Sequence, residues 1–277
     1  MEDMTLNNGV KMPMVGFGTY RVSSPEECGR SVAAALEAGY RMFDTAAYYG
    51  NEDLLGTALK ESGFPRGDLF LATKVWFRSF HGGLCRQSVL DSMERLKVDY
   101  LDLVLLHWPF GDVYAAWRDL EALYREGRIR AIGVSNFYAD RLVDLISFNE
   151  VAPAVNQVET NVLCQMREEH RWMEKYHVAH QAYTPLGRGR ALTDPVLCAA
   201  AAAHGKSPAQ TALRFLLQSG VSVIPKSSSP ERIRENIDIF DFALSEEEME
   251  RLRALDTGVP VIGTANTPEK VETAVSW

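Results

Sequence analysis

The feature that most constrains the fold is a repeated alternation of short apolar runs with amphipathic stretches along most of the chain. The runs are apolar at successive positions, which is typical of strands buried on both faces of a parallel sheet. The stretches between them have helical periodicity, as where Cys85, Val89, Met93 and Leu96 fall on one face. The apolar runs cover residues 14–20, 40–44, 69–74, 101–107, 129–136, 152–157, 179–185 and 221–226.

Helix-start signals support this alternation. Ser24 is followed by Pro25 and Glu27, which predicts an N-cap, a proline in the first turn and a capping box, and Gly39 predicts the end of that helix. Related openings stand at 194–195, 207–210 and 245–248. Strands that alternate with helices in this way indicate an α/β protein.

Roughly eight strand–helix units with short connections and no linker predict a single (β/α)8 TIM barrel, one domain over residues 1–277. Asn8-Gly9 between two short β-prone segments predicts an N-terminal β-hairpin ahead of the barrel. The alternative is an open doubly wound sheet, which would usually carry GxGxxG after its first strand if it bound a dinucleotide. The segments 16–21 and 187–192 begin that motif and fail at its last position.

Charge and cysteine content exclude several functions. The 29 Lys and Arg against 37 Asp and Glu give a net charge of -8, which argues against a nucleic acid or an anionic membrane as the main partner. No apolar run reaches the roughly 18 residues of a membrane span, and the first residues do not resemble a signal peptide. The four cysteines form no CxxC pair, so we expect a cytoplasmic protein without disulfides or a metal.

Most of the apolar runs end in a polar residue that is unsuited to a core. In a (β/α)8 barrel these ends point to one rim, where active sites form from strand termini and the loops that follow them. Seven polar ends converging there predict a functional site. They are Asp44, Lys74, His107, Asn136, Gln157, Tyr183 and Lys226.

Seven segments around these positions carry a family resemblance. They are FDTAAYYGNE, LATKVW, LLHWP, AIGVSNF, NQVE, AYTPLGRG and IPKSSSPERIREN. In this order they resemble the aldo-keto reductase family, most closely its small prokaryotic and protozoan reductases of the diketogluconate reductase and prostaglandin F synthase types. The resemblance extends from Leu6 to about Leu255.

The resemblance implies a catalytic tetrad of Asp44, Tyr49, Lys74 and His107. Tyr49 would donate the proton to the developing alkoxide, and the charge of Lys74 would lower the pKa of Tyr49. Asp44 would hold Lys74 in place, and His107 would orient the substrate carbonyl as a neutral imidazole. On sequence alone Tyr48 could be the donor, and only the family register selects Tyr49.

The resemblance also implies a bound NADPH or NADP. Tyr183 would stack on the nicotinamide, and Asn136 and Gln157 would bind its carboxamide. A helix opening after a lysine and hydroxyl groups is an anion site, and Arg232 would bind the 2′-phosphate, so NADP is preferred over NAD. The expected cofactor-binding residues are Ser135, Asn136, Gln157, Tyr183, Pro185, Leu186, Lys226, Ser227, Ser228, Arg232, Glu235 and Asn236.

The substrate pocket departs from the family pattern. The loop after His107 is short, and the segment after Leu255 is small and polar apart from Trp277. We expect Tyr20, Trp76 and Trp108, together with His107, to bind the substrate in a low-walled pocket. An open pocket makes few remote contacts, which favours small reactive aldehydes over hindered ketones.

The sequence therefore predicts NADPH-dependent reduction of aldehydes or ketones by a monomer whose partner is a small carbonyl substrate. Two alternatives remain open. One is a lyase in which Lys74 forms a Schiff base with the substrate, and the other is an NADPH-binding redox sensor with little turnover.

Overall fold

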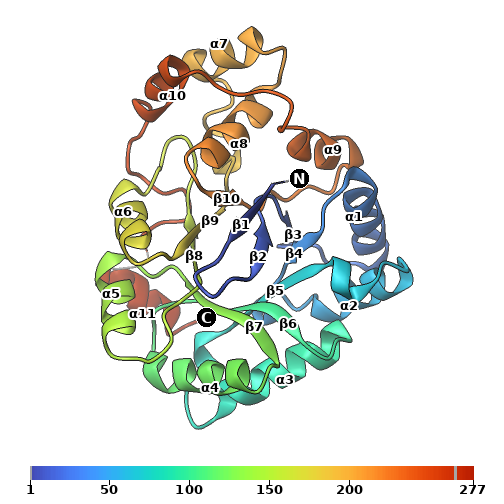
Figure 1. Cartoon of the computed structure of the whole chain (residues 1–277), viewed down its shortest axis with the longest axis vertical. Helices are drawn as coiled ribbons and strands as arrows, with labels where there is room; N and C mark the ends of the chain where they lie inside the picture. Colours follow the sequence, from blue (N-terminus) through green and yellow to red (C-terminus); the bar gives the residue numbers. More distant parts are fainter. Residues whose placement is uncertain (1, 265–266) are drawn as a thin grey trace.

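Eight of the strands form one sheet that curls into a barrel surrounded by helices (Figure 1). The computed structural model describes residues 2–264 and 267–277. The eight strands of the sheet run parallel and follow one another in chain order. They are β3 (Phe17–Gly18), β4 (Met42–Asp44), β5 (Phe70–Val75), β6 (Leu101–Leu106), β7 (Ile129–Ser135), β8 (Val155–Glu159), β9 (Ala179–Tyr183) and β10 (Ser222–Val223).

Hydrogen bonds between the first and last strands close the barrel. The backbone N–H of Gly16 donates to Val223 O at 2.8 Å, and that of Gly18 donates to Pro225 O at 3.1 Å. A parallel bridge joins Val15 to Val223. The predicted (β/α)8 fold is therefore confirmed, with every strand inside or within two residues of its apolar run.

The helices lie outside the strands, so that each strand buries one face in the barrel and the other against helices. The helices are α1 (Pro25–Ala38), α2 (Glu52–Glu61), α3 (Leu84–Leu96), α4 (Val113–Arg125), α5 (Ala139–Ser147), α6 (Arg167–Lys175), α7 (Pro195–Ala203), α8 (Pro208–Gln218), α9 (Pro230–Ile237), α10 (Glu246–Arg253) and α11 (Pro268–Ala274). Short 3₁₀ turns occupy Ala47–Tyr49, Arg66–Asp68, Phe77–Ser79 and Gly187–Gly189.

The helix ends follow the predicted caps with one exception. Ser24 caps α1 by accepting from the Glu27 N–H, and Gly39 ends that helix at φ 102°. The boxes at the starts of α8 and α10 are complete, whereas the box predicted for Glu27 does not form as expected. The Glu27 carboxylate instead pairs with Lys226 Nζ at 3.4 Å, because the chain after β10 brings that lysine to the start of α1.

The predicted hairpin is confirmed and covers the amino ends of the strands. β1 (Asp3–Thr5) pairs antiparallel with β2 (Lys11–Pro13), and Gly9 in the connecting turn has φ 84°. Asn8 Nδ2 donates to Arg130 O at the start of β7. Buried Met12 packs in the apolar cluster inside the barrel. The carboxyl ends of the strands are left for the site.

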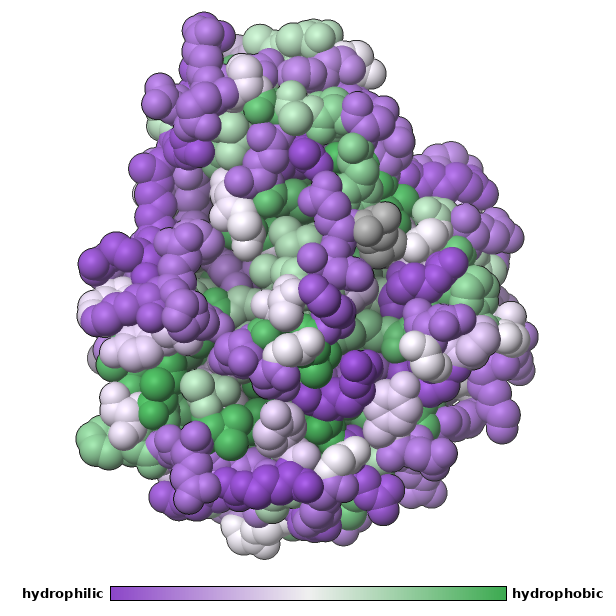
Figure 2. All heavy atoms as spheres, in the orientation of Figure 1, coloured by the Kyte–Doolittle hydropathy of each residue, from purple (hydrophilic) through white to green (hydrophobic). Residues whose placement is uncertain are grey.

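The face of the molecule seen in Figure 2 is mostly hydrophilic, with hydrophobic residues in smaller areas between. Within residues 2–264 and 267–277, no helix combines the length and apolarity needed to cross a membrane. All four cysteines are free.

Candidate active site

The carboxyl ends of the strands open into a cavity of about 920 Å³. Of the predicted site residues, only Lys74 and Ser228 do not line it. Lys74 lies behind the wall with 1% of its surface exposed, and Ser228 is exposed beside the cavity. The lining residues that the sequence predicted are Tyr20, Asp44, Tyr49, Trp76, His107, Trp108, Ser135, Asn136, Gln157, Tyr183, Pro185, Leu186, Lys226, Ser227, Arg232, Glu235 and Asn236.

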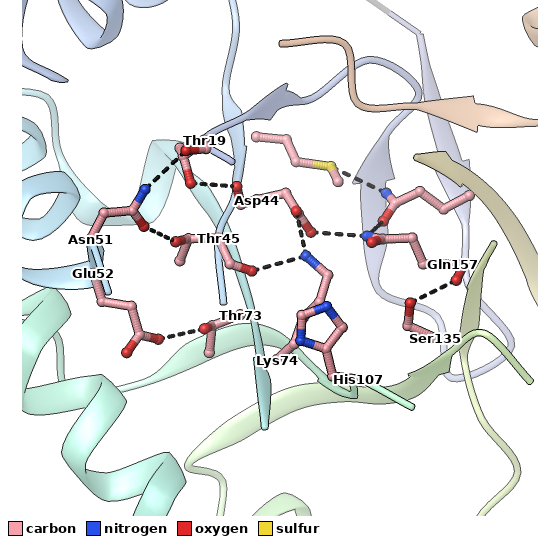
Figure 3. A network of polar contacts seen from close by, with 12 residues as sticks. Thr19, Asp44, Thr45, Asn51, Glu52, Thr73, Lys74, His107, Ser135 and Gln157 are labelled. Atoms are coloured by element: carbon pink, nitrogen blue, oxygen red, sulfur yellow. Dashed lines mark hydrogen bonds and ion pairs between the residues drawn. The ribbon is translucent and has the colours of Figure 1, made fainter. Parts of the chain in front are cut away.

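A buried network joins Lys74 to the neighbouring strands (Figure 3). Lys74 Nζ donates to Asp44 Oδ1 at 2.5 Å and to Thr45 O at 2.9 Å. The other oxygen, Asp44 Oδ2, accepts from Gln157 Nε2 at 2.9 Å, and the same nitrogen donates to Gln181 Oε1 at 2.7 Å. One carboxylate thus fixes both the lysine and the glutamine, a link that sequence reasoning missed.

Tyr49 is the tyrosine next to this lysine. Lys74 Nζ lies 5.1 Å from the centre of the Tyr49 ring, and that ring is 5.7 Å from the His107 ring. Tyr48 is 51% exposed and stacks on Trp76 at 3.9 Å. The register that selects Tyr49 therefore also selects the tyrosine that faces the lysine.

The electrostatics of the cluster differ from expectation at one residue. Burial and the nearby Asp44 carboxylate raise the pKa of Tyr49 well above that of a free tyrosine, opposite to the predicted lowering. Asp44 binds Lys74 directly, so its negative charge opposes the effect of the ammonium on the phenol. Burial lowers the pKa of Lys74, and Asp44 opposes that shift. Burial and the Lys74 charge hold the pKa of His107 well below 6.5, in agreement with a neutral imidazole.

A second layer supports the turn that carries Tyr49. Asn51 Nδ2 donates to Thr19 O at 2.9 Å, and its Oδ1 accepts from Thr45 Oγ1 at 2.8 Å. Glu52 is buried and pairs with Arg95 at 2.7 Å. Sequence reasoning assigned Asn51 and Glu52 no role, although both stand in the FDTAAYYGNE segment that carried the resemblance.

Amide side chains at the ends of β7 and β8 lie next to the Lys74–Asp44 pair and His107. Asn136 adopts φ 64°, and its Nδ2 donates to His107 O at 2.9 Å. Tyr183 OH donates to Asn136 Oδ1 at 2.8 Å, and Ser135 Oγ donates to Gln157 O at 2.8 Å. These contacts join the ends of β7, β8 and β9 into one polar wall.

The other end of the cavity lies at the start of α9. Ser229 caps this helix, and Arg232 is exposed in its first turn. In the described part of the chain Arg232 forms no ion pair. Ser207 Oγ donates to Glu235, which fixes the adjacent wall.

The expectation of a low-walled pocket is wrong, because the described parts of the 256–277 segment, residues 256–264 and 267–277, contribute to the cavity wall. The Glu159 carboxylate accepts from the backbone N–H groups of Val261 at 2.5 Å and Ile262 at 2.7 Å. Ile262, Lys270 and Trp277 line the cavity.

Packing of small residues allows this return. Ala274 in α11 is 2% exposed and packs in an apolar cluster with Trp108 and Phe110. The Trp277 ring then lies 5.4 Å from Trp108 and 6.1 Å from Trp76. The predicted aromatic wall is present, and the 256–277 segment extends it.

The closed barrel and the cavity at its strand ends define the class, an α/β-barrel protein with a cavity on the carboxyl rim. Residues 14–257 match the model of the Aldo/keto reductase family, and the chain belongs to that family. It is 44% identical over 256 residues to a glyoxal reductase of Bacillus subtilis, covering 92% of this chain and 93% of the relative. It is 41% identical over 274 residues to a morphine 6-dehydrogenase of Pseudomonas putida, covering 93% and 92%.

Solved structures agree with this assignment. An aldo-keto reductase from a deep-sea metagenome library superposes with a TM-score of 0.93 at 38% identity, covering 95% of this chain and 98% of the other. An aldo-keto reductase of Bombyx mori in complex with NADP superposes with a TM-score of 0.89 at 32% identity, covering 94% of each chain.

Proposed function

We propose that this protein reduces aldehydes and ketones to alcohols with NADPH. The observation that carries the proposal is that Tyr49 and His107 line one cavity while the buried Lys74–Asp44 pair lies directly behind Tyr49. Such an arrangement combines a proton donor, a hydrogen-bonding group for a carbonyl and a fixed positive charge. Membership of an oxidoreductase family supports it.

The residues present fit a nicotinamide cofactor. The cavity continues from Tyr49 to the start of α9, where the unpaired Arg232 guanidinium and Ser227 suit a phosphate. Near the strands, the Gln157 amide nitrogen is committed to Asp44 and Gln181, which leaves its oxygen to accept from a carboxamide N–H. NADPH would supply the hydride. The structure of the Bombyx mori relative in complex with NADP supports this choice.

Tyr49 would supply the proton. Its raised pKa keeps the hydroxyl protonated near neutral pH, so the donor form is fully populated. After transfer, the Lys74 ammonium 5.1 Å from the ring would stabilise the phenolate. Asp44 would hold that ammonium in place.

His107 would orient the substrate. Because its pKa is held well below 6.5, the ring is neutral and can donate one N–H to a carbonyl oxygen. Its ring lies 5.7 Å from Tyr49 and 5.2 Å from Trp76, so a carbonyl between them meets a donor on one side and an aromatic wall on the other.

The geometry disfavours a Schiff-base lyase. A lysine that attacks a carbonyl must reach the substrate as a free amine. Lys74 Nζ is hydrogen-bonded to Asp44 and Thr45 and is absent from the cavity lining.

We further propose a single-domain, cytoplasmic monomer, in keeping with the four free cysteines.

The test is the loss of NADPH absorbance against a panel of aldehydes, ketones and sugars, repeated with NADH. We expect turnover of at least one carbonyl class and a clear preference for NADPH. Tight NADPH binding with negligible turnover across the panel would reject the reductase and favour a redox sensor. Covalent trapping by borohydride with a carbonyl substrate, in the absence of nicotinamide, would favour the lyase.

A further inference from the structure

Lys270 is a cation in the cavity wall that has no acidic partner among the described residues. It is half-buried on α11 and lines the cavity. Its Nζ lies 4.7 Å from the centre of the Trp277 ring and 5.1 Å from that of Trp108. Within residues 2–264 and 267–277 it forms no ion pair, so two indole rings are its main neighbours.

The segment that carries Lys270 is anchored. Thr267 Oγ1 caps α11 by accepting from the Lys270 N–H at 3.2 Å. Arg78 Nη2 donates to Val275 O at 2.9 Å, and Ala274 is buried. Glu159 fixes the same segment upstream through Val261 and Ile262. The ammonium is therefore held over the cavity by contacts on both sides of it.

This ammonium lies on the same aromatic wall as the carbonyl-orienting histidine. The Trp277 ring is 6.1 Å from Trp76, and Trp76 is 5.2 Å from His107. A substrate whose carbonyl is at His107 would extend along these rings toward Lys270. The wall therefore has a polar reacting end, an aromatic middle and a cationic far end.

A cation in this position favours an anion in the cavity. Burial lowers the pKa of Lys270, and no carboxylate in the described part of the chain pairs with it to offset the lost hydration. The two acidic residues that line the cavity are engaged elsewhere, Asp44 with Lys74 and Glu235 with Ser207. A negatively charged group would compensate Lys270, and the cavity is where it could enter.

Other cations of the cavity are less suited to this role. Lys226 pairs with Glu27, and Arg232 lies at the start of α9 in the proposed cofactor region. Arg21 and Arg188 also line the cavity, but both are exposed, and Arg21 lies over the Tyr20 ring at 5.4 Å. Water screens such an exposed charge more strongly than a half-buried one.

We propose that Lys270 binds an anionic group on the remote end of the substrate, so that this reductase prefers aldehydes with a flat apolar body and a carboxylate or phosphate far from the carbonyl. The inference rests on the proposed function and adds a substrate class and a specificity-determining residue to it. The aromatic rings would hold the body of the substrate while Lys270 fixes its charged end.

The experiment compares 4-carboxybenzaldehyde with its methyl ester, which has the same ring and reactive group but no charge. The measured quantity is the ratio of kcat/KM for the acid to that for the ester, compared between proteins because the ester is intrinsically more electrophilic. We expect Lys270→Met to lower this ratio by about three- to tenfold, mainly through KM of the acid. A parallel arm with 4-formylphenyl phosphate tells whether a phosphate is preferred to a carboxylate.

Three variants serve as controls. Lys270→Arg keeps the charge and should restore most of the ratio, whereas Lys270→Glu should lower it further. Lys60→Met removes a lysine from the exposed face of α2, outside the cavity lining, and should leave the ratio unchanged. High salt should lower the ratio of the native enzyme and leave that of Lys270→Met unchanged.

An unchanged ratio in Lys270→Met overturns the proposal, as does equal loss of both substrates, which would mark Lys270 as a support for the wall only. Loss of the ratio in Arg21→Met but not in Lys270→Met would assign the anion to Arg21 and also overturn it. These outcomes require turnover of the ester with NADPH. Absence of turnover for every aldehyde would instead reject the reductase function itself.

Discussion

At the residue scale, the chemistry of the site depends on how one carboxylate is shared. Asp44 accepts from Lys74 on one oxygen and from Gln157 on the other. One carboxylate therefore links the lysine behind the proposed proton donor to the glutamine of the proposed cofactor site. The same charge raises the pKa of Tyr49. A raised pKa makes Tyr49 a weaker acid, so in the proposed reduction the Lys74 ammonium would have to stabilise the phenolate as the proton leaves.

Tyr49→Phe should lower kcat by about 10²- to 10⁴-fold, the usual contribution of a general acid, because the ring remains and the proton is lost. NADPH affinity, measured by fluorescence titration, should change little. Tyr48→Phe is the matched control, since Tyr48 is the adjacent, exposed tyrosine. Near-native kcat in Tyr49→Phe together with loss in Tyr48→Phe would shift the register by one residue.

Lys74→Met should abolish most turnover and also destabilise the fold by about 3–5 kcal/mol, because Asp44 keeps a buried negative charge without its cationic partner. The double variant Lys74→Met with Asp44→Asn should regain much of that stability and none of the turnover. Urea unfolding and kcat separate the two effects. Asp44→Asn alone should lower kcat less than Lys74→Met does, since the lysine can remain charged. A double variant with restored activity would remove the lysine from the mechanism.

The sequence located about half of the cavity-lining residues but not the forces between them. Polar residues at strand ends indicate the rim, because strand direction alone decides where they point. The pKa of Tyr49 could not be predicted in this way. It depends on burial and on the distance to Asp44, and both are properties of the folded chain.

At the element scale, the sequence predicted helix starts and turns that depend on a few neighbouring residues. The start of α1 and the turn at Gly9 depend on side-chain caps and on positive φ, which are properties of a few neighbouring residues. The path of the 256–277 segment could not be predicted, because it depends on Glu159, about 100 positions earlier, and on the fit of Ala274 against Trp108. Small polar residues carry no periodic pattern that would indicate such packing.

A strand–helix contact supplies an acid-sensitive element. His180 on β9 is buried, its Nε2 lies 2.7 Å from Thr160 Oγ1, and its Nδ1 lies 2.9 Å from His170 Nδ1 on α6. Burial, with a smaller contribution from the charge of His170, lowers the pKa of His180 to about 3. In the unfolded chain His180 binds a proton near pH 6.5, whereas in the folded chain it stays neutral until about pH 3. The free energy of unfolding therefore falls as the pH drops below about 6.5.

Between about pH 6.5 and pH 5.5, we expect the lowered pKa of His180 to cost roughly 1 kcal/mol of unfolding free energy, and His107, whose pKa is also lowered, to add to the loss. Urea unfolding at the two pH values measures the loss. His180→Gln should remove the part of this loss that comes from His180, roughly 1 kcal/mol, whether or not the variant is itself less stable. An equal loss in native and variant would show that other groups titrate in this range.

At the scale of the whole molecule, the barrel brings eight strand ends to one rim, so that residues from position 18 to position 277 line a single cavity. The hairpin covers the opposite end of the barrel, and the 256–277 segment adds the last wall. A cavity assembled from the whole chain couples ligand binding to the stability of the whole domain.

The chain should therefore unfold in a single thermal transition, and NADPH should shift that transition to a higher temperature. At a free concentration 100 times Kd, a ligand that binds only the folded state adds about 2.7 kcal/mol. For 277 residues that corresponds to a shift of about 5 °C.

Arg232→Ala should weaken NADPH binding by about 1.5–3 kcal/mol and leave NADH nearly unaffected, because the guanidinium is proposed to contact the 2′-phosphate alone. Thermal unfolding, followed by far-ultraviolet circular dichroism and by tryptophan fluorescence, measures the shift with each cofactor at one fixed concentration. The native protein should respond more to NADPH than to NADH, and Arg232→Ala should respond equally to both. If the variant keeps the native difference between the cofactors, the phosphate is bound elsewhere in the cavity. If the two probes separate into distinct transitions, the chain is not the single domain proposed.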